Sequence, residues 1–209
     1  MLGIHDLPLF IISGLLLNIA PGPDSLLIMT RSASQGWRAG SAAALGIGTG
    51  TLVHVLAAAL GLSALLSASA AAFTVVKVVG AAYLVYIGVG MLWTRRSQGA
   101  KPSDPLAPLS HRRIYAQGFL TNVLNPKVAL FFLAFVPQFI AADAPHKALA
   151  FIVLGLVFDF NGMLWCHALA LFTGMASRQL RLGRAWTAWL KRGIGAMFVG
   201  LGLRLALDR

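Results

Sequence analysis

Six long apolar stretches constrain this chain more than any other feature of its sequence. They cover residues 7–29, 39–66, 70–93, 114–140, 148–175 and 186–207. A helix that crosses the hydrocarbon core of a bilayer needs about 20 mostly apolar residues, and each stretch has about that length. Inside lipid an α-helix satisfies its own backbone hydrogen bonds, whereas an irregular chain does not. The sequence therefore predicts an all-α membrane protein with six transmembrane helices.

The charge composition supports the same class of protein. Charged residues make up 11% of the chain and hydrophobic residues 58%, whereas a soluble domain usually carries about 25% charged residues. The net charge of +11 would suggest nucleic acid in a soluble protein. Here the basic residues lie between the apolar stretches, as they do in the cytoplasmic loops of membrane proteins. We therefore predict contact with membrane lipid and no nucleic-acid partner.

The distribution of basic residues predicts the orientation. The first, third and fifth loops between the spans hold twelve basic residues. The opposite side of the membrane holds only Lys147, Arg204 and Arg209. Because basic loops stay in the cytoplasm, both termini are expected in the periplasm. The twelve are Arg31, Arg38, Arg95, Arg96, Lys101, Arg112, Arg113, Arg178, Arg181, Arg184, Lys191 and Arg192.

The two halves of the chain resemble each other. Gly14-Leu-Leu-Leu-Asn18 in the first span corresponds to Gly118-Phe-Leu-Thr-Asn122 in the fourth, and each precedes a proline. Repeats with an odd number of spans have opposite topology, a recurring design of secondary transporters. We predict two inverted three-helix repeats, 1–93 and 114–209, joined by a cytoplasmic linker, 94–113. A chance likeness between glycine-rich helices is the alternative.

Proline interrupts the first and fourth spans at corresponding places. Pro21-Gly22-Pro23-Asp24 lies within the first, and Asn125-Pro126-Lys127 within the fourth. Proline removes a backbone hydrogen bond from a helix, and such a break in the bilayer needs protein or water around it. Pro23 and Pro126 suit the first position of a new helix, and Asn125 suits its cap. We predict two broken helices that face one site; kinks that only shape packing are the alternative.

Asp24 and Lys127 follow the prolines of the two breaks. A free amino acid carries one ammonium and one carboxylate group, so Asp24 could hold the first and Lys127 the second. Alternatively, the two side chains form a buried ion pair with each other. The predicted substrate-binding residues are Asn18, Pro21, Gly22, Pro23, Asp24, Asn122, Asn125, Pro126, Lys127 and Asp159.

Asp159 lies near the middle of the fifth span, where an acidic side chain is costly and commonly functional. It is a candidate for proton coupling or for ammonium binding, together with Asp24 and Lys77 as coupling candidates. The alternatives are an ion pair between Asp159 and Lys77, a neutral buried acid, or snorkelling of Lys77 to the interface. His54 and His167 are single histidines in apolar helices, which favours core hydrogen bonding.

No sequence feature indicates an enzyme, a metal or a cofactor. Hydrolase, kinase and phosphate-loop motifs are absent, and the single cysteine, Cys166, excludes an intramolecular disulfide. Gly46, Gly48 and Gly50 are explained by close helix packing. Transport of a small solute driven by a gradient is thus the predicted function. A metal-ion exporter and a non-transporting membrane protein are the alternatives.

The motifs also resemble a known family, the LysE/RhtB family of bacterial amino-acid exporters. The likeness covers nearly the whole chain and implies export of amino acids or derivatives across the inner membrane, coupled to protons, with a homodimer as one assembly. The residues around the motifs resemble those of the homoserine, threonine and leucine exporters more than those of the lysine exporters. The motifs that carry it are Asn18-Ile-Ala-Pro21-Gly22-Pro23-Asp24, Gly46, Lys77-x-x-Gly80-Ala81-Ala82-Tyr83-Leu84, Gly118-x-x-x-Asn122-x-x-Asn125-Pro126-Lys127 and Pro137-Gln138-Phe139.

Overall fold

The computed structural model describes residues 2–62 and 108–176, together with seven single residues at 75, 78, 82, 85, 86, 89 and 199. These parts are almost entirely helical, and an isolated bridge between Ile4 and Ile140 is the only β-pairing among them. Apart from these single residues, the predicted third and sixth spans lie outside the described residues, as do Lys77 and most of the linker 94–113.

The first predicted span is a broken helix. It consists of α1 (Leu7–Ile19) and α2 (Pro23–Gln35), whose axes differ by 53°. Gly22 between them is extended, with φ −155°. Pro23 is the first residue of α2, where its missing N–H and fixed φ suit a helix start. The predicted break in the first span is therefore confirmed.

The fourth predicted span is broken in the same way. It consists of α6 (His111–Val123), α7 (Pro126–Leu130), the π-helical η2 (Phe131–Phe135) and the 3-10 helix η3 (Val136–Phe139). The bend between α6 and the following part measures 45°. The Asn125 side chain caps α7 by accepting the Lys127 backbone N–H at 3.0 Å. The predicted cap and the second break are both confirmed.

Two further spans are long helices. One is α3 (Trp37–Ala57), extended by the π-helical η1 (Ala58–Leu62), and the other is α8 (Lys147–Ala176). Both are long and apolar enough to cross a membrane, and each bent pair reaches that length as one unit. The described residues thus hold four candidate spans of an all-α membrane protein.

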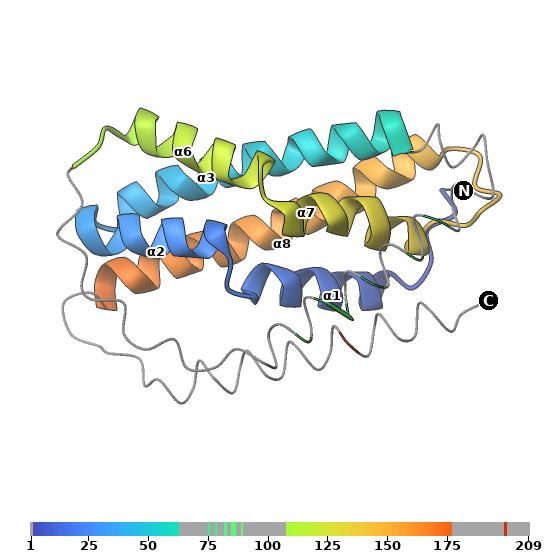
Figure 1. Ribbon diagram of the computed structural model, residues 1–209, viewed down its shortest axis with the longest axis horizontal. Helices are drawn as coiled ribbons and strands as arrows, with labels where there is room; N and C mark the ends of the chain where they lie inside the picture. The colour runs from blue at the N-terminus through green and yellow to red at the C-terminus, as the bar shows by residue number, and fades with distance from the viewer. Residues whose placement is uncertain are drawn as a thin grey trace.

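Corresponding spans of the two halves run in opposite directions. In Figure 1 the chain runs from right to left through α1 and α2, and from left to right through α6 and α7. It likewise runs from left to right through α3 and from right to left through α8. Opposed directions in both pairs are what inverted repeats require.

One segment differs from the sequence prediction. The apolar stretch ends at residue 29, but α2 continues to Gln35, so Arg31 lies in a helix and not in a loop. Its side chain is buried. The helix ends at Gly36, whose φ of 85° and ψ of 170° are accessible almost only to glycine.

The helix α3 lies at the centre of the described bundle and packs against α2, α6 and α8. Its contact with α6 is close because small residues face each other. A side chain on Gly46 would collide with the Tyr115 carbonyl oxygen, and one on Gly118 with the Ala43 carbonyl oxygen. Such contacts between small residues allow membrane helices to approach through their backbones. The predicted packing role of Gly46 is confirmed.

Gly46→Ala is therefore expected to lower the thermal stability of the purified protein, by about 1–3 kcal/mol, because the new Cβ meets the backbone of α6. Gly61→Ala is the matched control, since a Cβ on Gly61 has no atom within 4 Å. Melting of both variants in detergent checks this prediction. Equal melting temperatures would contradict the close contact between α3 and α6.

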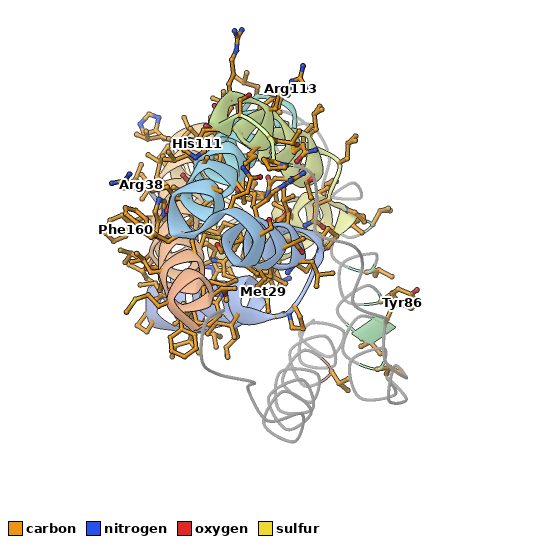
Figure 2. The ribbon with its side chains drawn as sticks, turned by 90° about the vertical axis from the view of Figure 1, so that its left-hand side faces the viewer. Met29, Arg38, Tyr86, His111, Arg113 and Phe160 are labelled. Carbon is orange, nitrogen blue, oxygen red and sulfur yellow. The ribbon has the colours of Figure 1, made fainter. Side chains whose placement is uncertain are left out.

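The outer surface of the bundle is strongly apolar. Leu60 is 75% exposed, Phe160 65% and Leu164 58%. Figure 2 shows Phe160 on the outside of the bundle. A surface of this kind suits contact with lipid chains, since a soluble monomer rarely exposes so many large apolar residues.

Candidate functional site

The two helix breaks meet through Asp24. One carboxylate oxygen, Oδ2, accepts hydrogen bonds from Asn122 Nδ2 at 2.9 Å and from Asn125 Nδ2 at 3.0 Å. Asp24 belongs to the first turn of α2, Asn122 to the last turn of α6, and Asn125 caps α7 after the break. The carboxylate therefore joins the broken span of one half to that of the other.

The second carboxylate oxygen of Asp24 differs from the first. Among the residues that the structure describes, Oδ1 is buried and makes no hydrogen bond. A buried anionic oxygen without a donor is unfavourable, because burial removes its water without replacing the lost hydrogen bonds. This oxygen is therefore ready to accept a hydrogen bond from a bound cation.

Lys127 caps the end of α1. Its Nζ donates to the Leu17 carbonyl at 3.0 Å and to the Ala20 carbonyl at 3.0 Å. The last carbonyls of a helix lack partners within the helix, and a cation stabilises that end further. An ammonium group has three N–H donors, so one remains after these two bonds.

Asp24 and Lys127 do not form an ion pair. Among the described residues the charged pair within 4 Å is His5 with Asp6, at 3.6 Å. Lys127 instead bonds backbone carbonyls, and Asp24 bonds amides. Of the two alternatives left by the sequence, direct pairing is not what the structure shows.

Both side chains line one small cavity of about 30 Å³ among α1, α2, α3, α6, α7 and α8. A water molecule needs roughly 10–15 Å³ of such space, so the cavity has room for about two waters. An amino acid would require the surrounding helices to separate. The lining residues are Leu17, Asn18, Asp24, Ser25, Ile47, Gly48, Thr51, Asn122, Lys127, Val128, Phe158, Asp159, Gly162, Met163 and Cys166.

Asp159 and Asn18 complete the polar lining. Asp159 comes from the middle of α8, and a Cβ on Gly48 of α3 would lie 3.4 Å from its Oδ1. Asn18 Nδ2 donates to the Phe158 carbonyl at 3.5 Å. Asp24 and Asp159 thus line the same cavity from different helices.

The ten predicted site residues divide into two groups. Five line the cavity: Asn18, Asp24, Asn122, Lys127 and Asp159. The other five, Pro21, Gly22, Pro23, Asn125 and Pro126, lie outside the lining and form the breaks. Gly22 makes room for the lysine, since a Cβ there would lie 3.3 Å from Lys127 Nζ.

Sequence reasoning missed the polar support around Asn122. Thr51 Oγ1 lies 3.4 Å from Asn122 Oδ1. His54 Nε2 donates to the Asn122 carbonyl at 3.0 Å, while His167 bonds the Met163 carbonyl of its own helix at 2.9 Å. Core hydrogen bonding of both histidines is confirmed. The sequence could have indicated Thr51, because it lies one helical turn before His54 and so on the same face of α3.

Comparison with known proteins identifies the family. The sequence profile of the LysE type translocator matches residues 15–209. The chain belongs to the LysE-type translocator family. This confirms the resemblance seen in the broken-helix motifs, and it makes the chain a multi-pass membrane protein of a transporter family.

Several relatives match over almost their full length. An uncharacterized membrane protein of Pseudomonas aeruginosa, PA4757, is 33% identical over 209 residues, with 98% of this chain and 96% of that protein covered. A homoserine/homoserine lactone efflux protein of Salmonella typhi is 30% identical, with 96% and 95% covered. A leucine efflux protein of Salmonella typhimurium is 26% identical, with 94% and 92% covered. No solved structure matches significantly.

Proposed function

We propose that this translocator exports small neutral amino acids or close derivatives across the bacterial inner membrane. The observation that carries the proposal is a pair of oppositely charged groups in one cavity, each able to form a further hydrogen bond. Asp24 Oδ1 has no donor among the described residues, and Lys127 Nζ has one N–H beyond its two carbonyl bonds. The two groups suit the ammonium and the carboxylate of a zwitterion.

The remaining wall of the cavity suits a neutral side chain. Ile47, Met163 and Phe158 contribute apolar surface. A basic or acidic substrate would place a further charge against this surface, which is unfavourable without a partner. The relatives named for leucine and for homoserine efflux support the same substrate class.

The proposed transport cycle uses the two breaks as its moving parts. Because the cavity holds only about 30 Å³, substrate must enter by separation of the broken helices on one side of the membrane. Departure on the other side requires the opposite separation, and inverted repeats provide two such states of similar energy. Asp24 and the two amides that bond it hold the broken spans together in the closed state.

We also propose that export is coupled to protons through Asp159 or Asp24, with Lys77 as a third coupling candidate outside the described residues. Both aspartates line the cavity, so a change in protonation there would alter substrate binding directly.

Both termini are proposed to be periplasmic. The two repeats are proposed to span 1–93 and 114–209 around the linker 94–113, and two copies can form a homodimer.

Cells that overproduce the chain test the proposal. They are expected to resist toxic analogues of neutral amino acids and to release labelled leucine, threonine or homoserine faster than cells with an empty vector. Resistance restricted to metal salts, with no change in amino-acid efflux, would contradict the proposal in favour of a metal-ion exporter.

A reporter fused after Arg209 tests the orientation, and activity specific to the cytoplasm would overturn it.

A further inference from the structure

A second polar site lies on the outer surface, between α2 and α6. It is a groove of about 420 Å³ that shares no lining residue with the central cavity. Its polar walls come from Thr30 and Arg31 of α2 and from Gln117 and Thr121 of α6. Leu26 is 61% exposed and Leu120 is 55% exposed beside them. The groove thus combines four polar residues with exposed apolar side chains on the outer surface of the bundle.

Arg31 is the charged residue of this groove. It is only 6% exposed, and it donates to Gln117 Oε1 at 3.0 Å and to Gln35 Oε1 at 3.4 Å. Its Nε is buried and has no hydrogen-bond partner in the described part of the chain. A guanidinium group has five N–H donors, so three remain after these two bonds.

No acid balances the Arg31 charge in the described part of the chain. Both of its partners are neutral amides, and the ion pair found there joins His5 and Asp6. A buried charge without a counter-ion is costly, and charged residues within membrane segments are usually paired. Among the described residues no acid lies within 4 Å of Arg31, which leaves its charge open to an anion bound from outside them.

The position of Arg31 favours a lipid headgroup as the source. Arg31 precedes the end of α2 at Gln35 by four residues, which is about 6 Å along a helix. That places the guanidinium near the level of the phosphate layer. His111 and Arg113 lie around the same end and on the outside of the bundle (Figure 2). In the proposed orientation this end faces the cytoplasm, where basic pockets between membrane helices bind anionic headgroups.

We propose that this groove binds an anionic phospholipid. The headgroup phosphate accepts hydrogen bonds from Arg31 and from the amide of Gln117, whose Nε2 is left as a donor because its Oε1 accepts from Arg31. One acyl chain lies along Leu26 and Leu120. A guanidinium group matches phosphate geometry with two parallel bonds. The lipid neutralises Arg31 and holds α6 against α2, the helix that carries Asp24 in its first turn.

Lipid retention by the purified full chain tests this site. Wild-type protein, Arg31→Gln and Arg38→Gln are each incubated with phosphatidylglycerol or phosphatidylcholine of equal chain length, and bound lipid is counted by native mass spectrometry. Arg38 is the matched control, because it is exposed and lies over the Trp37 ring at 5.5 Å. We expect Arg31→Gln to reduce phosphatidylglycerol retention by about tenfold or more, and Arg38→Gln to leave it unchanged.

A second variant keeps the test valid if Arg31→Gln does not fold. Leu120 is 55% exposed in the groove, and Leu120→Trp narrows the groove while Arg31 stays in the chain, so this variant should also lose phosphatidylglycerol. Three results would overturn the proposal. They are full retention by both groove variants, equal retention of phosphatidylcholine by wild-type protein, and displacement of the lipid by an equal concentration of soluble glycerol phosphate.

Discussion

Asp24→Asn is expected to reduce amino-acid efflux on the order of a hundredfold or more, while the protein still reaches the membrane. The substitution is nearly isosteric, and an asparagine carbonyl can still accept from Asn122 or Asn125. What it removes is the negative charge on Oδ1, which has no hydrogen-bond partner among the described residues. Loss of one member of a buried charge contact costs about 2–5 kcal/mol. A cost in this range corresponds to the expected loss of efflux.

Asp143→Asn is the matched control for this prediction. Asp143 is an exposed acid of the loop between η3 and α8, so the same chemical change there should leave efflux unaltered. Efflux of labelled substrate, divided by the amount of protein in the membrane fraction, is the measurement. Wild-type efflux by Asp24→Asn would remove Asp24 from the binding site.

Lys127→Met is expected to abolish efflux and also to lower the melting temperature. Methionine has similar length but no N–H, so the Leu17 and Ala20 carbonyls lose the donors that bond them at 3.0 Å. A buried polar group left without its partner costs about 1–3 kcal/mol. Both effects follow from one side chain, because Lys127 caps α1 and also lines the cavity.

Lys147→Met separates this double role from a general effect of losing a lysine. Lys147 donates to the Ala144 carbonyl at 3.4 Å and lies outside the cavity. A neutral amino acid at 100 times its dissociation constant should stabilise wild-type protein by about 2.7 kcal/mol and should not stabilise Lys127→Met. If Lys127→Met melts like Lys147→Met and still responds to substrate, the assigned role of Lys127 is wrong.

The two breaks could be predicted from sequence because proline acts locally. Pro23 and Pro126 have no backbone N–H, and Asn125 can bond the N–H two residues later, so these residues specify helix starts whatever surrounds them. The long apolar stretches are likewise determined by the lipid around the helices and not by contacts between particular residues. For these reasons the helical class and both bends agree with the sequence prediction.

The partners of the charged residues could not be predicted in the same way. Whether Lys127 bonds Asp24 or the end of α1 depends on where the carbonyls of Leu17 and Ala20 point in three dimensions. Asn125 has two roles, since its Oδ1 caps α7 while its Nδ2 bonds Asp24. A short sequence motif indicates the first role but not the second.

Arg31 shows a different limit of sequence reasoning. The polar residues after Met29 resemble a loop, because the apolar stretch stops there, yet the helix continues until Gly36. One face of that last part packs on α3 and α6, which buries Arg31. Whether a single residue in such a turn is buried depends on which other helices pack against it, and this cannot be read from the local sequence.

The central claim is that one cavity binds the two charges of an amino acid and carries it across the membrane. Counterflow in proteoliposomes tests it most directly. Vesicles with purified protein are loaded with unlabelled leucine, threonine or homoserine, diluted, and supplied with the labelled compound outside. Wild-type vesicles should accumulate label well above protein-free vesicles, and Asp24→Asn vesicles should not. Absence of amino-acid counterflow with folded wild-type protein, or equal counterflow with Asp24→Asn, would contradict the account.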